Sequence, residues 1–286
     1  MEKLLNYCLR LLVISSLPLF FACENTPVLY KKSFTKEAQK KIASQMLGGL
    51  KFCYQGSVPC QLLMEEALHL DSTHPEIHRE LGIPYLKRGF PADYEPHYAN
   101  TVKYGAVEWQ GWRGYIYLYF YRDYERALAD FKALDTLTPN FVDYPQATSV
   151  LFMSAICHLK MGNYDQAIQL FDDHITEELR TTTEDFIDTK TYLFQGIAYY
   201  KNGDSFSAKK SFDRGLKNLE ENADLWYWTA KLAYENGEFT VAKAALEKAQ
   251  QYFDGEYYNK RPYVEEFFQI HQLDLTELNQ KIDQFN

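Results

Sequence analysis

Hydrophobic and polar positions alternate along residues 188–254 with the period of α-helices, and short turns that contain Gly interrupt the alternation. Small residues midway along each helix would let two antiparallel backbones approach, and large residues would fill the groove between them. A constant period of this size predicts stacked helix pairs. Six positions recur after 34 residues: Tyr192, Tyr199, Gly203, Ala208, Phe212 and Gly215 return as Trp226, Ala233, Gly237, Ala242, Leu246 and Ala249.

The same order of helix, turn and helix extends towards the N-terminus. Helices often end at a Gly because Gly adopts the left-handed conformation at little cost. One predicted turn has no Gly, and Arg122-Asp123 must form it. Insertions at Pro139–Gln146 and Glu177–Thr189 lengthen two of the intervals. The expected turns are Gly56, Gly89, Arg122, Gly162, Gly203 and Gly237, with spacings of 33, 33, 40, 41 and 34 residues.

These residues resemble the tetratricopeptide repeat. The family's pattern of aromatic, Gly, Tyr, Ala and Phe is represented in one copy by Phe194, Gly196, Tyr199, Ala208 and Phe212. The next copy matches it at Trp226, Tyr234, Ala242 and Ala249. The resemblance implies an all-α fold, a right-handed α-solenoid of about six tetratricopeptide-like helix pairs over residues 35–256.

Residues 257–286 follow the last predicted pair. Pro262–His271 and Asp274–Phe285 have the features of two further helices, with Pro262 at a favourable first position. The last repeat of a solenoid exposes apolar surface unless something covers it. We expect these C-terminal helices to cap the last repeat. The alternative is that they fold back into the concave groove and block it.

Residues 1–22 are predicted to be a signal peptide. Lys3 and Arg10 flank the apolar run Leu11–Phe21, which is shorter than the roughly 20 residues that span a bilayer. Ala22-Cys23 then resembles the end of a bacterial lipoprotein signal, in which the Cys carries lipid. Ordinary secretion is the alternative. Residues 23–34 would be a membrane tether, and the protein would lie in the bacterial cell envelope, anchored at the outer membrane on its periplasmic or surface face.

Two further cysteines flank the first predicted turn. In an exported protein, Cys53 and Cys60 can pair as a disulfide, and the alternative is two separate buried thiols. Cys157 lies in a helical run and is expected to be a small core residue.

Charge and motifs exclude several classes of function. Lys and Arg number 30 against 39 Asp and Glu, which gives a net charge of −9 and no electrostatic support for binding nucleic acid. His74 and His78 are one helical turn apart, but Pro75 stands where a zinc hydrolase has Glu. Asp172-Asp173-His174 has the pattern of a solvated helix end. We therefore expect no enzyme activity, no metal site and no small-molecule cofactor.

The family resemblance implies that the first helix of each pair lines a concave groove, which binds a protein or peptide partner through apolar and aromatic contacts. The alternative is that this wall is buried as core. We expect a non-catalytic, lipid-anchored scaffold that assembles envelope complexes or serves secretion, or else a glycan-capturing surface lipoprotein built on the same repeats. The predicted groove residues are Arg79, Ile83, Trp112, Ile116, Tyr119, Phe152, Ile156, Leu193, Ile197, Tyr200, Tyr227, Lys231 and Tyr234.

Overall fold

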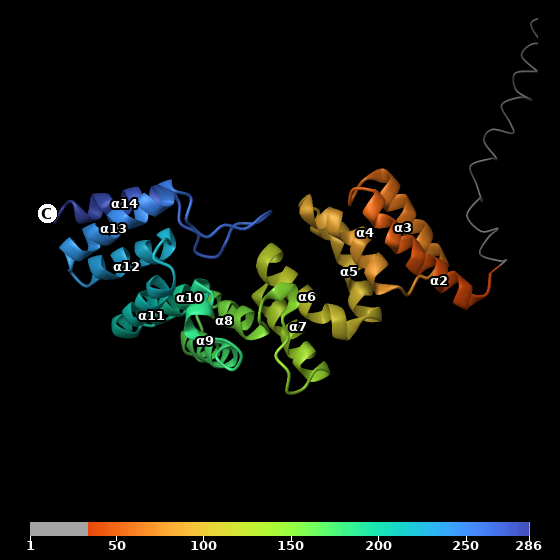
Figure 1. Ribbon diagram of the computed structural model, residues 1–286, viewed down its shortest axis with the longest axis horizontal. Coiled ribbons are helices and arrows are strands. Elements are labelled where there is room, and N and C mark those ends of the chain that lie inside the picture. The colour runs from red at the N-terminus through yellow and green to blue at the C-terminus, as the bar shows by residue number, and fades with distance from the viewer. Residues whose placement is uncertain (1–33, 286) are drawn as a thin grey trace, which may run out of the picture. The chain divides into compact units, whose positions relative to one another are not determined.

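The computed structural model describes residues 34–285, and the chain divides after Gly105 into two compact units (Figure 1). Thirteen α-helices and no strand are present in this described part, which confirms the all-α prediction. Among the helices of these residues, none combines the length and the hydrophobicity that a membrane span requires. The predicted signal peptide, Cys23 and all but the last residue of the predicted tether lie outside the described residues.

The first unit contains two helix hairpins. Thr35 caps the first helix by accepting a hydrogen bond from the Ala38 amide at 3.2 Å, and Pro75 occupies the first position of the third, as the sequence predicts. Ala43, Met64 and Ile77 are fully or almost fully buried between the helices. The elements are α2 (Lys36–Leu47), the 3₁₀ helix η1 (Gly48–Phe52), α3 (Val58–Leu70), α4 (Pro75–Lys87) and α5 (Pro91–Tyr104).

The cysteines of this unit lie at the tip of its first hairpin. The Sγ atoms of Cys53 and Cys60 are bonded to each other, with a Cα–Cα distance of 5.8 Å. The bond joins the end of η1 to the first turn of α3. Cys157 lies in the second unit, where burial raises the pKa of its thiol to about 12.

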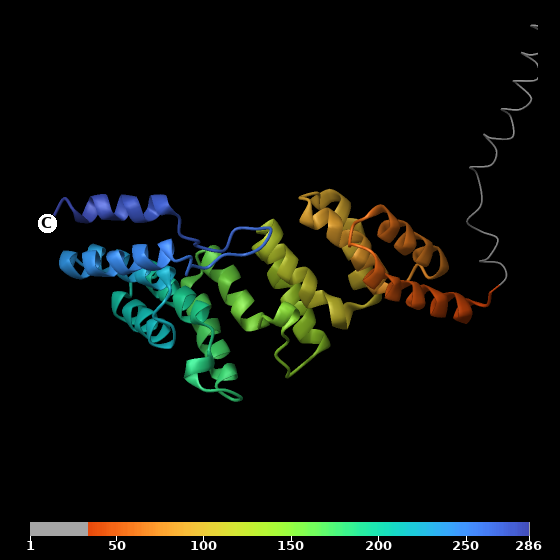
Figure 2. The same ribbon diagram turned by 45° about the horizontal axis from the view of Figure 1, so that its top comes forward.

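The second unit contains four hairpins and a final helix (Figure 2). Together with the two hairpins of the first unit they make the six predicted pairs. The elements are α6 (Ala106–Ile116), the π-helical turn η2 (Tyr117–Tyr121), α7 (Tyr124–Leu137), η3 (Pro145–Ala147), α8 (Val150–Lys160), α9 (Tyr164–Glu178), η4 (Glu184–Phe186), α10 (Thr189–Lys201), α11 (Ser205–Asn218), α12 (Ala223–Glu235), α13 (Phe239–Asp254) and α14 (Gln272–Ile282).

The repeated positions occupy equivalent places in neighbouring hairpins. Ala208 on α11 and Ala242 on α13 are both completely buried. Gly196 on α10 lies against the ring of Phe212 so closely that a Cβ atom would come within 2.3 Å of it. The alternation of small and large residues therefore sets the distance between the helices of a pair.

All six predicted turn residues have positive φ. The values are 79°, 77°, 82°, 84° and 79° at the five Gly positions, and 56° at Arg122. The left-handed conformation is uncommon for a residue with a side chain. Before Arg122 the helix widens into the π-helical turn η2, and the Asp123 amide donates to the Tyr117 carbonyl at 2.9 Å. The prediction that Arg122-Asp123 forms this turn is confirmed.

The segment after α13 differs from the expectation. The sequence predicts a helix over Pro262–His271, and this prediction is wrong. Residues 255–271, which we call the strap, contain no helix, because Glu256, Tyr263 and Phe268 have φ values of 63°, 70° and 52°. Only α14 follows it, and α14 packs on α12 and α13 through buried residues that include Leu275 and Ile282.

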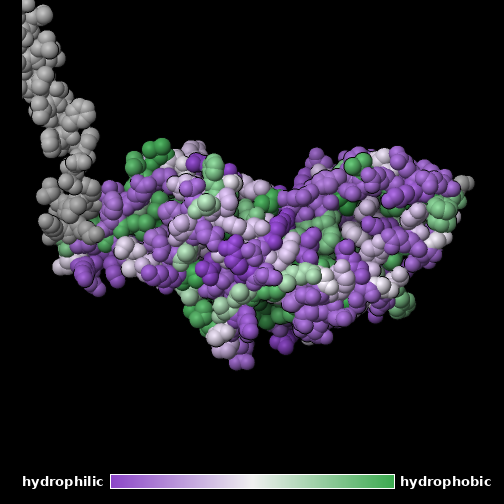
Figure 3. Space-filling view, turned by 180° about the vertical axis from the view of Figure 1, so that it is seen from behind, coloured by the Kyte–Doolittle hydropathy of each residue, from purple (hydrophilic) through white to green (hydrophobic). Residues whose placement is uncertain are grey.

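Most of the surface on the side shown in Figure 3 is hydrophilic, and hydrophobic residues lie on it in scattered groups. Single exposed aromatic side chains such as Phe52, Tyr54 and Phe206 are ordinary for a folded protein.

The close contact at Gly196 yields a stability prediction. Gly196→Ala would place its methyl group inside the Phe212 ring, so we expect a loss of about 1–3 kcal/mol in the free energy of unfolding. Thermal unfolding followed by circular dichroism measures the effect. Gly48→Ala is the matched control, because nothing lies within 4 Å of the added methyl and φ is −61°. Equal effects of the two substitutions would contradict the packing described.

Candidate functional site

The strap crosses the first helices of the four hairpins in the second unit. In Figures 1 and 2 it is the blue segment that runs from the end of α13 towards α6 and returns to α14. We call the surface it covers the inner face, defined by the residues of α6, η2, α8, α10 and α12 that contact it: Tyr115, Tyr119, Lys160, Lys190, Phe194, Lys201, Asp224 and Trp228, together with Arg122 of the following turn.

The strap begins with backbone hydrogen bonds at the start of α12. The Tyr257 carbonyl accepts from the Ala223 amide at 2.8 Å, and the Asn259 amide donates to Asp224 Oδ2 at 2.7 Å. Asp224 is 1% exposed, and this burial raises the pKa of its carboxyl from 3.8 to about 6. The first turn of α12 and a buried carboxyl therefore fix the direction in which the strap leaves.

Two cations and a buried carboxylate hold the middle of the strap. Glu266 is 3% exposed, and its Oε2 lies 3.0 Å from Lys190 Nζ on α10 and 3.5 Å from an Arg261 nitrogen. The Arg261 guanidinium also lies 3.7 Å from the centre of the Tyr119 ring and donates to the Tyr115 hydroxyl. A buried carboxylate needs such partners, because leaving it unpaired would be strongly destabilising.

Two consecutive aromatic residues bind the inner face on either side of α8. Phe267 is 4% exposed, and its ring centre is 5.4 Å from that of Tyr119 on η2. Phe268 lies between Phe194 on α10 and Trp228 on α12, at 6.2 and 6.1 Å. Full burial of an aromatic side chain is worth about 1.5–3 kcal/mol. These rings therefore make a large apolar contribution to holding the strap.

The inner face is basic, although the whole chain carries a net charge of −9. The Arg122 guanidinium lies 4.0 Å from the Phe267 ring centre, and Lys160 Nζ lies 4.6 Å from that of Phe268. Burial and the neighbouring charges of Arg122 and Lys201 lower the pKa of Lys160. A cavity of about 370 Å³ remains between these cations and the strap. Aromatic rings and cations together suit an extended peptide that contains both acids and aromatic residues.

Family models match three of the four hairpins in the second unit. Two models described as tetratricopeptide repeat match residues 195–256 and 149–175. The chain is a tetratricopeptide-repeat protein. Tetratricopeptide repeats generally form non-catalytic scaffolds that bind protein partners. No curated protein matches the sequence.

Solved structures share this tetratricopeptide fold. That of pilF from Pseudomonas aeruginosa has a TM-score of 0.57 and 16% identity, over 86% of this chain and 99% of that one. PilW, described as a widely conserved type IV pilus biogenesis factor, has a TM-score of 0.56 and 14% identity, over 77% and 94%. Cut9 in the APC/C heterotetramer Cut9–Hcn1 has a TM-score of 0.57 and 12% identity, and the match covers 96% of this chain and 52% of that one. At these identities the likeness shows the fold alone.

The structure places most of the predicted groove residues of this tetratricopeptide-repeat protein in the core. They do not form an open wall, because the neighbouring helices bury most of them and the strap contacts Tyr119. Arg79 and Ile83 belong to the first unit, where Arg79 pairs with Glu80. The buried residues are Ile83, Ile116, Tyr119, Phe152, Ile156, Leu193, Ile197 and Tyr227, and the partly buried ones are Arg79, Trp112, Tyr200, Lys231 and Tyr234.

Tyr119 is a predicted groove residue that meets the strap, whereas two other contact residues are displaced by one position from predicted ones. Phe194 and Trp228 make the contacts, and they directly follow the predicted Leu193 and Tyr227. Leu193 and Phe194 lie four and three residues before Ile197, and both of these spacings place a side chain near Ile197 on the helix surface. The repeat period alone therefore does not say which of the two faces the strap. The 34-residue step from Phe194 to Trp228 was a signal that could have found this pair.

The residues considered for metal chemistry do not converge. His74 Nε2 lies 3.3 Å from Ser44 Oγ, whereas His78 Nε2 lies 3.0 Å from the Ser72 carbonyl oxygen. No group of three or more His, Cys, Asp or Glu residues within 34–285 could hold a metal ion. The interpretation of Asp172-Asp173-His174 as a solvated helix end is wrong for His174, which is 6% exposed.

The Asp224 carboxyl yields a pH prediction. The folded protein retains this proton up to about pH 6, while the unfolded chain releases it near 3.8, so Asp224 stabilises the fold at low pH and loses this effect as the pH rises through 6. This difference between the two pKa values corresponds to a change in the free energy of unfolding on the order of 3 kcal/mol. Asp224→Asn keeps an acceptor for the Asn259 amide without the charge. We therefore expect this variant to gain stability relative to the natural protein between pH 4.5 and 7.5.

Urea unfolding at several pH values within this range measures the difference. Asp135→Asn is the control, because Asp135 is exposed on α7 and its removal should leave the pH dependence unchanged. Parallel pH profiles for the natural protein and Asp224→Asn would contradict the assignment.

Proposed function

We propose that this tetratricopeptide-repeat protein is a lipid-anchored, non-catalytic scaffold of the bacterial cell envelope, and that its inner face binds an extended segment of a protein partner in exchange with the strap. The observation that carries the proposal is the strap itself. It is an extended piece of polypeptide seated on the inner face by buried rings and by charge pairs.

The strap indicates the chemistry of the partner segment. Its sequence contains two acidic residues followed by two aromatic ones, Glu265, Glu266, Phe267 and Phe268. A competing segment must supply a carboxylate for Lys190 and rings for the surface between Phe194 and Trp228. Recognition of an extended peptide by alternating pockets and charges is a common mode of binding. We therefore propose a partner segment that is acidic and aromatic.

Anchoring follows from the sequence at Cys23, which would place the two units beside a membrane. Lipid chains attached at one cysteine hold a protein at a bilayer, because each buried CH₂ contributes about 0.8 kcal/mol. PilW is described as a type IV pilus biogenesis factor. A role in assembling an envelope complex would agree with that likeness, and it would require an anchor and a peptide-binding surface but no catalytic residues.

The exchange with the strap is testable with the strap's own sequence as a free peptide. A labelled peptide of residues 260–271 should bind the natural protein weakly, because a tethered segment competes at an effective concentration on the order of millimolar. The double variant Phe267→Ala/Phe268→Ala loosens the tethered copy. We expect it to bind the free peptide at least tenfold more tightly in fluorescence anisotropy.

Two controls accompany this experiment. A peptide with both glutamates replaced by Lys should not bind, because it would oppose Lys190 and Arg122. Phe206→Ala removes a ring that is 81% exposed on α11 and should leave the affinity unchanged. A double variant that keeps its helical circular dichroism and yet gains no affinity for the peptide would refute the exchange.

The anchor is tested separately. Cys23→Ser should move the protein from the membrane fraction to the soluble envelope fraction and abolish labelling by an alkyne-bearing fatty acid, because the acyl chains would have no attachment point. Immunoblotting of fractionated cells measures the first effect. Cys157→Ser is the control, since that thiol is buried. Unchanged lipid labelling of Cys23→Ser would exclude this cysteine as the anchor.

A further inference from the structure

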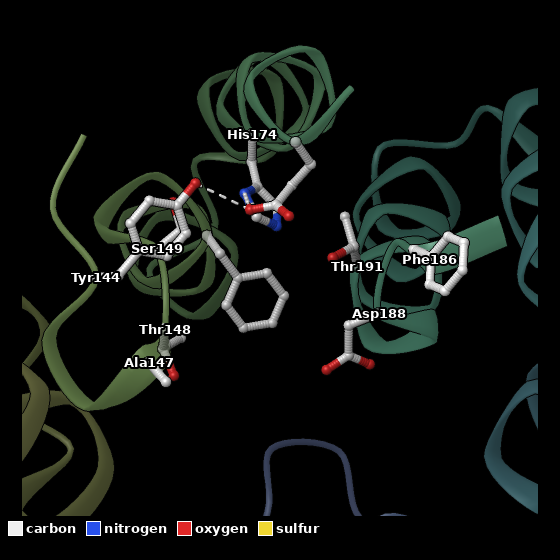
Figure 4. A pocket seen from close by; sticks show the side chains of 10 residues that line it. Tyr144, Ala147, Thr148, Ser149, His174, Phe186, Asp188 and Thr191 are labelled. Carbon is white, nitrogen blue, oxygen red and sulfur yellow. Dashed lines mark hydrogen bonds and ion pairs between the residues drawn. The ribbon is translucent and has the colours of Figure 1, made fainter. Parts of the chain in front are cut away.

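A second site lies between the two insertions of the second unit (Figure 4). The insertion before α8 and the insertion before α10 face each other across a cavity of about 180 Å³, closed at one end by α9. The side chains that matter here are Tyr144, Phe152, His174, Glu178, Asp188 and Thr191. No strap residue is among those that line the cavity, so this site is separate from the inner face.

Two carboxylates border the cavity without an ion pair to Lys or Arg within residues 34–285. Glu178 Oε1 accepts a hydrogen bond from the Tyr144 hydroxyl at 2.9 Å, and Asp188 Oδ1 accepts one from the Lys190 amide at 2.9 Å. Within residues 34–285 neither carboxylate forms an ion pair with Lys or Arg. The surrounding segment 172–188 contains seven acids and one Arg. The site therefore attracts cations.

Two buried polar side chains that line the same cavity lack hydrogen-bond partners. Thr191 is completely buried and its Oγ1 has no partner, and Figure 4 shows this hydroxyl pointing towards the space between α8 and α10. His174 is 6% exposed, and its Nδ1 makes no hydrogen bond, although it lies 3.8 Å from Glu178 Oε1. Buried polar groups in native proteins nearly always have partners. These two atoms point to a ligand that carries hydrogen-bond donors.

The formal charge of the site is negative at neutral pH. Burial lowers the pKa of the His174 imidazole, which is therefore neutral above its usual titration range. The charged and titratable groups that face it are Glu178 on α9, Asp188 at the start of α10 and Tyr144 from the first insertion, whose pKa burial raises to about 12. With both carboxylates ionised, the formal charge is two negative units, Glu178 plus Asp188.

Aromatic rings complete the lining. Phe152 is 7% exposed and packs 5.6 Å from the His174 ring, while Tyr144 and Phe186 lie at the mouth with 43% and 80% of their area exposed. A planar cation that carries several donors fits carboxylates and ring faces together, and guanidinium has this geometry whereas ammonium does not. We propose that this cavity binds the guanidinium of an arginine side chain presented by a polypeptide.

Arginine satisfies each feature of the site. Its five N–H donors can be shared among the acceptors that line the cavity, Glu178, Asp188 and Thr191 Oγ1, and its plane can stack on Phe152 or Tyr144. The space is about six times the roughly 30 Å³ that a water molecule occupies in the liquid, which is enough for a side-chain head and its stem. The polypeptide nature of the ligand rests on the proposed scaffold function, whereas the cation preference of the cavity does not.

The test is a titration with N-acetyl-L-arginine amide followed by NMR shifts of backbone amides in residues 144–152 and 174–191. We expect a dissociation constant in the millimolar range, which is usual for a ligand of this size. N-acetyl-L-citrulline amide has the same shape without the charge and should bind at least tenfold more weakly. Stronger binding of the citrulline analogue, or of a neutral disaccharide, would overturn the assignment in favour of a polar or glycan site.

Two variants locate the site without disturbing the fold. Glu178→Gln/Asp188→Asn removes both charges and keeps an acceptor for Tyr144 and a helix cap for α10, so arginine binding should fall at least tenfold. Glu125→Gln/Asp135→Asn removes two charges from exposed positions on α7 and should leave binding unchanged. If both double variants weakened arginine binding equally, the binding would depend only on the net charge of the protein, and this would refute the site.

Thr191→Val supplies a readout that a structural role would not give. It removes the unpartnered hydroxyl at nearly constant volume, so arginine binding should weaken several-fold while the thermal midpoint stays the same or rises. Unchanged binding by this variant would exclude the hydroxyl from the site. These experiments do not involve the strap, so their failure would leave the exchange on the inner face standing, and the reverse also holds.

Discussion

The burial of one aromatic surface determines the form of the second unit. The first helices of its hairpins carry rings on two sides: one side packs within the stack, and the other faces inwards at Tyr119, Phe194 and Trp228. Hairpins that contact only their sequential neighbours cannot cover this inward side. Exposing it would leave an apolar area that soluble proteins rarely tolerate. The strap resolves this constraint, and Phe267 and Ile270 become as buried as the core itself.

Charge gives this packing its selectivity. Glu266 is almost completely buried and is held by Lys190 and Arg261, and an ion group in such a place contributes little net stability once its desolvation is counted. The ion group instead discriminates between peptide segments, because a segment without a carboxylate at this point would leave the Lys190 ammonium without an anionic partner and without water. The rings therefore provide most of the attraction, while the charge pair fixes which sequence can lie there and in which register.

The features that could be predicted from the sequence are those encoded locally. Gly at five turns needs a positive φ, and Ala208 and Ala242 are small because two helices cross there, so the hairpins and their order follow from single residues and their spacing. The strap could not be predicted in this way. Val264, Phe267, Phe268 and His271 have helical spacing, and only distant partners on α6, α10 and α12 make an irregular backbone preferable.

The candidate sites show the same division. Resemblance to the family identified the correct helices for the inner face, but choosing Phe194 over Leu193 depends on how a helix is rotated within the stack. His174 was assigned to a solvated helix end together with the two acids before it, whereas the insertions on either side enclose it. Long-range burial of this kind has no local signal in the chain.

The position of the two insertions links the two sites. Both sites use α8 and α10, one on the inner face at Lys160 and Phe194 and the other at Phe152 and Thr191. The strap covers the first site and leaves the second uncovered. A partner that competes with a tethered segment needs a high local concentration, since it must match the strap's own effective concentration. A polypeptide already held by one arginine between the insertions would have that advantage, so the open cavity can serve as the entry point to a surface that is otherwise closed.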